Sequence, residues 1–188
     1  MPAIHACPLP GDSLLAAHSR PGDHTDCYAI DVPGEVDLST FVEAFYTSRG
    51  FLPELLFLTL VGRGATRAQA RRLARAETDR FAAWRVEART TSELLLQDYL
   101  GRTRSWLRAE PLAAGGTRLC FGSGIIRREG RGLGARIERR LFRALLPGHA
   151  AYSRVLLGAA VRMLPSGKAS CPFTPPPSAP ELDRRGRR

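Results

Sequence analysis

The side chains best suited to chemistry lie in the stretch Leu94–Ala109, which reads LLLQDYLGRTRSWLRA. It contains one carboxylate, Asp98, close to the hydroxyls of Thr103 and Ser105. A carboxylate held beside hydroxyls in a cavity can anchor a ligand or move a proton. Alternatively, Asp98 lies near a hairpin end, where it is solvated or bonded to the backbone. No histidine or second acid accompanies it at a spacing typical of a known reaction.

The faces of this stretch follow from its turn. Gly101-Arg102 fits a two-residue hairpin loop, because a type II′ turn requires glycine at the first position. This register opposes Asp98 with Ser105, and Leu96 with Leu107. Because opposed residues share a face, the face expected to point inward carries Leu94, Leu96, Asp98, Leu100, Thr103, Ser105 and Leu107. The other face carries Leu95, Gln97, Tyr99, Arg104, Trp106 and Arg108. A register shift of one residue would turn every side chain of one of the two strands to the opposite face.

The arginine and aromatic side chains of the second face have two interpretations. Tyr99 and Trp106 could stack nucleic-acid bases while Arg104 and Arg108 bind phosphate. The alternative is cation–π pairing on a solvated sheet face, with the arginine stems covering the rings. No recognised single-strand-binding motif accompanies the patch, so we favour the solvated face and expect both arginines at the surface.

Cysteine and histidine usage indicates no cofactor. Cys7, Cys27, Cys120 and Cys171 are scattered singly, without a CxxC pair or a Cys/His cluster at zinc spacing. Neither a structural zinc nor a disulfide framework is therefore expected. His149 stands at the start of a C-terminal helical pattern, where we interpret it as a structural cap.

The charge of the chain raises the possibility of nucleic acid or an anionic membrane as a partner. The formal net charge is +10 and the pI is near 10.6. Only Lys168 among the 28 basic residues is a lysine, a bias that favours GC-rich codon usage over selection for phosphate binding. Both partners are therefore disfavoured, and the sequence leaves the oligomeric state open.

The N-terminus lacks a charged start followed by an apolar run. The longest apolar run, Phe51–Val61, is too short to span a bilayer. We therefore expect a cytoplasmic protein.

Proline content divides the 188 residues into three parts. Residues 1–22 carry four prolines and no sustained period, which predicts a flexible leader that buries nothing. Residues 23–164, with enough apolar residues for a core, predict one domain. Residues 165–188 contain PPP and end in DRRGRR, which is typical of a disordered tail.

Within the domain, helices are expected after a first strand and before a group of strands. Asp37 is expected to cap a helix, and Thr66 with Gln69 forms a capping box that opens another, running to about Thr78. Between them, the run from Pro53 to Val61 fits a short helix or a buried strand. Asp26–Val32 is expected to be the first strand, closed by Pro33-Gly34, and alternating residues predict strands over Trp84–Arg89 and Thr117–Ile125.

The C-terminal part has two helical patterns. The first carries a narrow basic face of Arg136, Arg139, Arg140 and Arg143. That face could lie on anionic lipid, but a solvated surface is the commoner explanation. Pro147-Gly148 is expected to break or kink the helix. The second pattern, Ala150–Leu164, is apolar nearly all round and must be mostly buried.

Several runs of the sequence resemble an uncharacterised family of bacterial proteins, a domain of unknown function related to the START/SRPBCC superfamily. The similar runs are FVEAFYTSRGF, DRFAAWRVEARTTSELLLQDYLGRTRSWL, GGTRLCFGSGI and FRALLPGHAAYSRVLL. The resemblance covers about residues 24–164 and implies a helix-grip fold, in which a curved antiparallel sheet grips a long C-terminal helix. Such folds use an apolar cavity for lipids, polyketides or hormones. The resemblance transfers no catalytic residue.

We therefore expect an α+β, helix-grip-like domain that binds a small apolar ligand between the sheet and the C-terminal helix. Small residues at Ser105, Ser123 and Ala159 would leave the space for a cavity. The expected ligand-binding residues are Leu96, Asp98, Ser105, Leu107, Phe121, Ser123, Tyr152 and Leu156. Two alternatives stay open: an enzyme of the same fold that acts on a hydrophobic substrate through Asp98, and a basic protein that binds nucleic acid or an anionic membrane.

Overall fold

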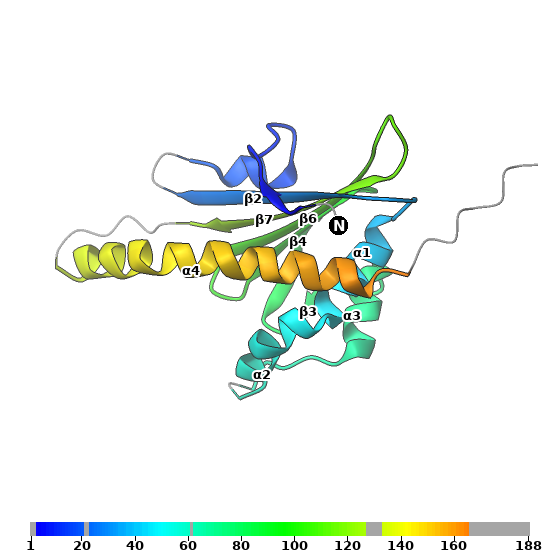
Figure 1. The fold of residues 1–188 in the computed structure, drawn as a ribbon. Coiled ribbons are helices and arrows are strands. Elements are labelled where there is room, and N and C mark those ends of the chain that lie inside the picture. Colours follow the sequence, from blue (N-terminus) through cyan, green and yellow to red (C-terminus); the bar gives the residue numbers. More distant parts are fainter. Residues whose placement is uncertain (1–2, 21–22, 61, 127–132, 166–188) are drawn as a thin grey trace, which may run out of the picture.

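The computed structural model describes residues 3–20, 23–60, 62–126 and 133–165 (Figure 1). The side chains of residues 133–147 lie outside this description, as do those of a few residues between 54 and 61. The basic helical face around Arg139 and nearly all of the expected C-terminal tail are thus outside the described residues.

The described strands form one antiparallel sheet in the order β1-β2-β7-β6-β5-β4-β3. Their bounds are β1 (His5–Ala6), β2 (His24–Val32), β3 (Arg80–Phe81), β4 (Trp84–Arg89), β5 (Glu93–Asp98), β6 (Thr103–Pro111) and β7 (Thr117–Ile125). The two longest pairings join β2 to β7 and β7 to β6. The α+β class and the curved antiparallel sheet that the sequence predicts are therefore present.

Each face of the sheet has its own apolar core. One core, on the inner face, collects residues such as Ile30, Leu96 and Phe121 together with the α-helices. The other, on the outer face, collects their alternate neighbours Leu95, Trp106 and Cys120. Successive strand residues point to opposite faces, so the alternation in the sequence builds two cores instead of one core and one wet surface.

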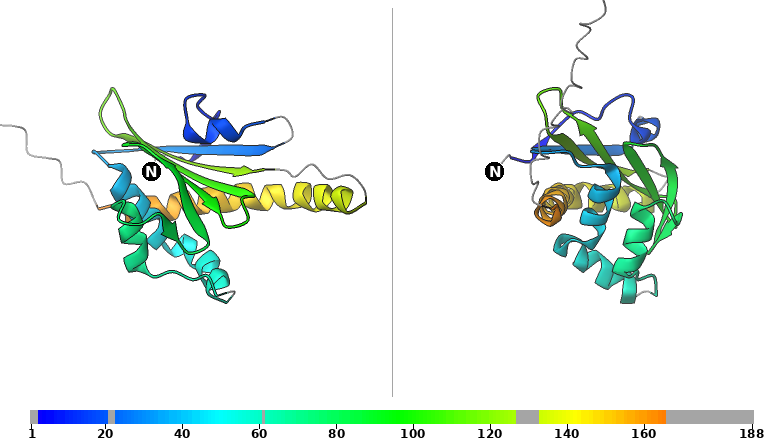
Figure 2. Two further views of the ribbon diagram at one scale, coloured as in Figure 1. Left: turned by 180° about the vertical axis from the view of Figure 1, so that it is seen from behind. Right: turned by 90° about the vertical axis from the view of Figure 1, so that its right-hand side faces the viewer.

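The inner face is covered by the helices α1 (Leu38–Thr47), α3 (Arg67–Ala74) and α4 (Leu133–Met163) and by the short 3₁₀ helix η2 (Arg49–Phe51), whereas α2 (Leu52–Leu60) follows η2 and lies away from the sheet (Figure 2). Both predicted caps are confirmed. Asp37 Oδ1 accepts a 2.6 Å hydrogen bond from the Thr40 amide, and Thr66 and Gln69 form a complete capping box. The run after Pro53 is helical, and α3 ends at Ala74, short of the expected Thr78.

The long helix α4 runs without interruption through Pro147-Gly148, so the expected break there is wrong. Its C-terminal half docks closely on the segment after α1. A Cβ atom built on Gly50 would lie 2.8 Å from the Ala159 Cβ, which shows how little space separates them. Leu156, Leu157 and Ala160 are buried in the inner core. Val155 and Met163 are exposed, so the expectation that this part of the helix is mostly buried is correct for one side only.

The N-terminal segment begins at the edge of the sheet, where Ile4 packs on the inner core, and from Cys7 onward it lies on the outer face, opposite α4 (Figure 1). Its short strand β1 pairs with β2, and the 3₁₀ helix η1 (Leu14–His18) places Leu15, with no exposed surface, against the outer core. The expectation that this leader buries nothing is therefore wrong for the described residues. A single leucine on a short 3₁₀ turn gives no period that a sequence pattern can detect.

The hairpin between β5 and β6 pairs with a register two residues from the predicted one. Leu96 lies opposite Ser105, and Leu94 lies opposite Leu107. The loop comprises residues 99–102 instead of two residues, because β5 ends at Asp98 and β6 begins at Thr103. Within it, the Gly101 amide donates a hydrogen bond to the backbone oxygen of Asp98. A shift of two residues keeps each paired residue on its predicted face. Tyr99 and Leu100 are exceptions, because they lie in the loop and are exposed.

Candidate ligand-binding site

A cavity of about 210 Å³ lies between the inner face of the sheet and the helices α1 and α4. Aromatic and aliphatic side chains dominate its wall, and hydroxyls and one imidazole supply the polar groups. It is lined by Phe45, Tyr46, Phe51, Trp84, Thr103, Arg104, Ser105, Phe121, Ser123, Gly124, Ile125, His149, Tyr152, Ser153 and Leu156. Ligand sites typically combine such an apolar wall with a few convergent polar groups.

One polar group in the wall is a pair of hydroxyls. Tyr46 on α1 and Ser105 on β6 lie 3.0 Å apart between their oxygen atoms, and both residues are buried. Tyr46 also contacts the rings of Phe45, Phe51 and Phe81. The ring cluster fixes the position of the phenol, so the polar edge of the cavity is held by packing.

The second polar group joins three elements. The Ser123 hydroxyl on β7 donates a 2.7 Å hydrogen bond to Asp26 Oδ1 on β2, and His149 Nε2 on α4 lies 2.7 Å from the same hydroxyl oxygen. The Ser123 amide donates to Asp26 Oδ1 as well, at 3.0 Å. Asp26 Oδ2 has no hydrogen bond within the described structure and lies 3.7 Å from His149 Nε2.

The arrangement of Asp26, Ser123 and His149 differs from that of a serine-hydrolase triad. In a triad the carboxylate orients the histidine, which in turn contacts the serine. Here the carboxylate accepts a hydrogen bond from the serine directly, so the O–H group of Ser123 is already engaged with Asp26. The hydroxyl can therefore accept a hydrogen bond from His149, which makes the cluster a fixed polar patch linking α4 to the sheet.

Five of the eight sequence-predicted site residues line this cavity: Ser105, Phe121, Ser123, Tyr152 and Leu156. They come from β6, β7 and α4, as expected. Leu96 and Leu107 lie elsewhere, in the solid inner core with no exposed surface. Both have the predicted face and lie opposite the lining residues Ser105 and Phe121, but their own side chains are packed within the core.

Asp98 does not line the cavity. Its Oδ1 accepts hydrogen bonds from the amides of Arg102, at 2.6 Å, and Thr103, at 3.0 Å. The carboxylate therefore closes the hairpin loop, which was the alternative interpretation of this residue. The prediction that Asp98 is a polar residue of the pocket wall is wrong. The enzyme hypothesis assigned the reaction to Asp98 and is therefore left without a catalytic residue.

Sequence reasoning missed Asp26 and His149. The sequence predicts Asp26 only as the first residue of a strand, and His149 only as a helix cap. Neither lies near the other or near Ser123 in the sequence, and only the pairing of β2 with β7, which opposes Asp26 to Ser123, brings them together. The apolar residues around His149 were the one available signal, since an unexplained imidazole on a buried helix needs a polar partner.

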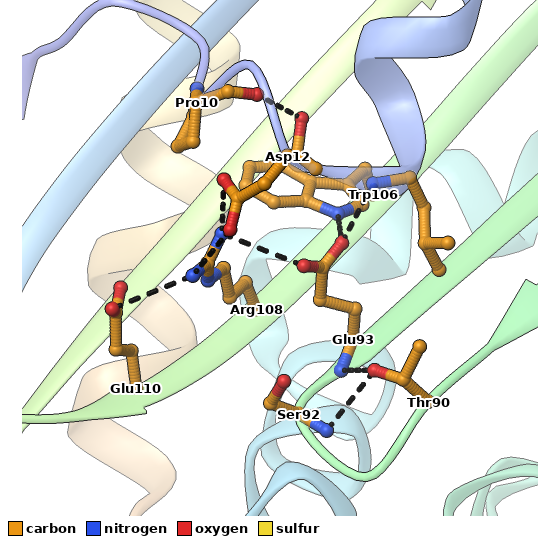
Figure 3. A network of polar contacts seen from close by, with 10 residues as sticks. Pro10, Asp12, Thr90, Ser92, Glu93, Trp106, Arg108 and Glu110 are labelled. Carbon is orange, nitrogen blue, oxygen red and sulfur yellow. Dashed lines mark hydrogen bonds and ion pairs between the residues drawn. The ribbon is translucent and has the colours of Figure 1, made fainter.

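The outer face of the hairpin is covered, not solvated. Trp106 is fully buried, and its Nε1 donates a 2.7 Å hydrogen bond to Glu93 Oε2, which also accepts the Leu14 amide at 2.8 Å. Arg108 pairs with Asp12, Glu93 and Glu110 (Figure 3).

Arg104 is only 7% exposed, with its Nε 2.8 Å from Glu87 Oε2. Neither Trp106 nor Arg104 thus presents a surface for bases or phosphates, and the expectation that both hairpin arginines lie at the surface is wrong. Tyr99 is the exception: it is exposed, and the Arg63 guanidinium lies 3.9 Å from the centre of its ring.

Comparison with known proteins found no match among family models, curated proteins or solved structures. Among the described residues, no three acidic, histidine or cysteine side chains are placed to hold a metal ion. A search of the same residues for a helix with the length and apolarity to cross a bilayer found none.

Proposed function

We propose that the chain is a helix-grip-like domain of the START/SRPBCC type that binds one small, largely apolar ligand between its sheet and α4. The observation that carries the proposal is the cavity itself: an apolar wall with two fixed polar groups, located between β6, β7 and α4. A chain that needed only stability would gain by filling this space, because unfilled core volume destabilises a fold.

The size of the cavity limits the ligand. A volume of about 210 Å³ exceeds the ~150 Å³ of an engineered apolar cavity that accommodates benzene. A substituted single ring or a short acyl chain fits this space. A long-chain lipid or a steroid requires the cavity to expand.

The polar groups limit the chemistry of the ligand. The Tyr46–Ser105 hydroxyls and the imidazole of His149 can both donate and accept hydrogen bonds. The Ser153 hydroxyl also lines the cavity and has no hydrogen-bond partner among the described residues. A ligand with one hydroxyl or carbonyl oxygen on an apolar body satisfies this wall.

Native mass spectrometry of freshly purified protein tests the proposal, since a bound small molecule adds a defined mass. Trp84 lines the cavity, so titration with small aromatic alcohols and short fatty acids is expected to change the tryptophan fluorescence. Trp84→Phe abolishes the signal without abolishing binding. Wild-type protein that neither carries a ligand nor binds any probe of this class overturns the proposal.

A filling substitution locates the site. Ser105→Phe places a ring in the cavity, and we expect it to abolish probe binding while the circular dichroism spectrum stays unchanged. Ala114→Phe adds the same ring on an exposed loop and should leave binding unchanged. Equal binding by both variants would place the ligand elsewhere.

A second candidate function is catalysis on the bound ligand, favoured by the 2.7 Å contact between Ser123 Oγ and His149 Nε2. In this alternative His149 moves a proton to or from the ligand, within hydrogen-bond reach. The two functions are separated by the fate of the ligand. A carrier releases it unchanged, whereas an enzyme releases a product, and His149→Ala would then stop conversion without stopping binding.

A further inference from the structure

Three thiols that are far apart in the sequence meet on the outer face of the sheet. Cys7 follows β1, Cys27 lies in β2 and Cys120 lies in β7. The sulfur atoms of Cys7 and Cys27 are 3.1 Å apart, and Cys120 packs with both residues in the outer core. The cluster lies outside the cavity and plays no part in the proposed ligand binding.

The backbone holds Cys7 and Cys27 directly opposite each other. β1 pairs His5 with Ala29 and Ala6 with Tyr28, and the next position along this register opposes Cys7 to Cys27. The Cys7 amide donates a 3.0 Å hydrogen bond to the Cys27 carbonyl. Opposed residues in such a hydrogen-bonded pair have Cα atoms about 5.5 Å apart, within the range that disulfides span without backbone movement.

We propose that Cys7 and Cys27 form a reversible disulfide that fastens the N-terminal segment to the sheet. The bond would close a loop that contains η1 and its buried residue Leu15. A crosslink that closes such a loop restricts the unfolded chain, so the oxidised protein keeps its outer core covered under conditions that detach the segment from the reduced protein.

The pairing of Cys27 with Cys120 is less suitable. β2 and β7 oppose Cys27 to Gly122 and Ala29 to Cys120, so the two cysteines lie on a diagonal. Diagonal neighbours in a sheet are about 7–8 Å apart, beyond the Cα separation of most disulfides. Cys120 is also only 3% exposed, whereas Cys7 is half-buried.

The oxidant that fits this site is a small disulfide, such as oxidised glutathione. The sulfur of Cys7, the more accessible of the pair, attacks one sulfur of the reagent, forms a mixed disulfide and releases one thiol. The sulfur of Cys27 then attacks the Cys7 sulfur and displaces the second thiol. Two protein thiols and one small disulfide thus yield one protein disulfide and two small thiols, which carry away both protons.

Burial raises the pKa of the Cys7 thiol, and the thiolate is the attacking form. The exchange is therefore expected to accelerate as the pH rises. In a reducing compartment the pair stays reduced, and it closes when small disulfides accumulate.

The test uses the full chain with Cys171→Ser, which removes the one cysteine outside the described residues. The folded protein is incubated with oxidised glutathione, alkylated and digested with trypsin. Trypsin does not cut between Arg20 and Pro21, so residues 1–49 stay together and contain only Cys7 and Cys27. We expect this peptide to be two hydrogens lighter and unalkylated, while the peptide of residues 119–127, which carries Cys120, is alkylated.

The functional readout is the melting temperature before and after oxidation. We expect it to rise on oxidation and to return with a reductant. Cys7→Ser should abolish both the mass change and the rise, whereas Cys120→Ala should keep both. A crosslink to the Cys120 peptide, two free thiols after prolonged oxidation, or a disulfide that leaves the melting temperature unchanged would each overturn the proposal.

Discussion

Trp106 and Glu93 are hydrogen-bonded beneath the N-terminal segment, with 2.7 Å between Trp106 Nε1 and Glu93 Oε2. The Leu14 amide donates to the same carboxylate oxygen, so Glu93 joins three elements: η1, β5 and β6 (Figure 3). A buried carboxylate is tolerated only where donors surround it. Here an indole and a backbone amide donate hydrogen bonds, and the Arg108 guanidinium forms an ion pair with Glu93 at 3.5 Å.

Replacement of Glu93 by alanine is expected to lower the free energy of unfolding by at least about 2 kcal/mol. The change leaves the Trp106 indole and the Leu14 amide without an acceptor, and each buried unsatisfied donor costs about 1–3 kcal/mol. Urea unfolding measures the difference. Glu110→Ala is the control, because this half-exposed carboxylate, 3.4 Å from Arg108, forms a surface pair worth at most about 1 kcal/mol. Similar losses for both variants would contradict the assignment.

Leu15→Ala is expected to destabilise the fold by about 2–5 kcal/mol, the usual cost of truncating a fully buried leucine. The comparison is Leu52→Ala on α2, where the side chain is 46% exposed and the expected change is within about 0.5 kcal/mol. Denaturant unfolding of both variants decides the matter. If Leu15→Ala behaves like Leu52→Ala, the N-terminal segment does not pack on the sheet in solution.

Arg104→Ala is expected to cost about 1.5–3 kcal/mol, the range for hydrogen bonds to charged groups. The guanidinium bonds Glu87, Gln97 and the Gly101 carbonyl, and it stabilises both the sheet and the hairpin loop. Arg85→Ala serves as the matched control: its side chain is 67% exposed and lies 3.7 Å from Asp79. The reverse order of the two losses would mean that the outer face is open to water.

The strand alternation predicted the faces of the hairpin correctly even though its turn was misassigned. Faces depend on residue parity, which a two-residue shift preserves, whereas the loop depends on Asp98 capping its amides. The N-cap at Asp37, the capping box of Thr66 and Gln69, and the presence of a C-terminal helix are equally local signals, and the sequence is sufficient to predict them.

The second layer on the sheet was not predictable in this way. The sequence pattern indicates a solvated face for Arg104, Trp106 and Arg108. Their respective partners Glu87, Glu93 and Asp12 are distant along the chain, so no local pattern predicts them. For the same reason, the sequence does not predict that Asp26 and His149 belong to the site. It also does not predict that Cys7 lies beside Cys27. Local patterns report which side a residue points to, and long-range pairing decides what it meets there.

Stability at low pH is expected to depend on Asp31. Its carboxylate forms a two-pronged pair with Arg118, at 2.7 and 2.9 Å, and these hydrogen bonds hold the pKa of Asp31 below its ordinary value. A depressed pKa in the folded state gives stability that is present above the unfolded pKa of about 3.9 and is lost as the pH falls through the folded value.

Asp31→Asn should therefore lower the urea midpoint at pH 6 but make no difference once the carboxyl group of the wild type is protonated. Because both side chains are more than 40% exposed, the effect is expected to be small and to shrink with added salt. Asp79→Asn, at a longer and more exposed pair, is the control. A difference between wild type and Asp31→Asn that persists unchanged at pH 2 would contradict the pKa assignment.

Substitutions at two glycines, Gly148 and Gly50, test how α4 packs on the rest of the fold and are expected to change stability in opposite directions. Gly148 lies within the helix, and a Cβ atom added there meets nothing within 4 Å. Gly148→Ala is therefore expected to stabilise the protein by about 0.5–1 kcal/mol, because alanine loses less backbone entropy in a helix.

At Gly50 the same added carbon would lie 2.8 Å from the Ala159 Cβ and 3.4 Å from the Val155 carbonyl oxygen. Gly50→Ala should then force α4 away from η2 and cost about 1–3 kcal/mol. Thermal unfolding of the two variants measures both signs. Because α4 also forms one wall of the cavity, Gly50→Ala should weaken probe binding, whereas Gly148→Ala should not. If Gly50→Ala instead stabilises the protein, α4 and the segment after α1 are not in contact.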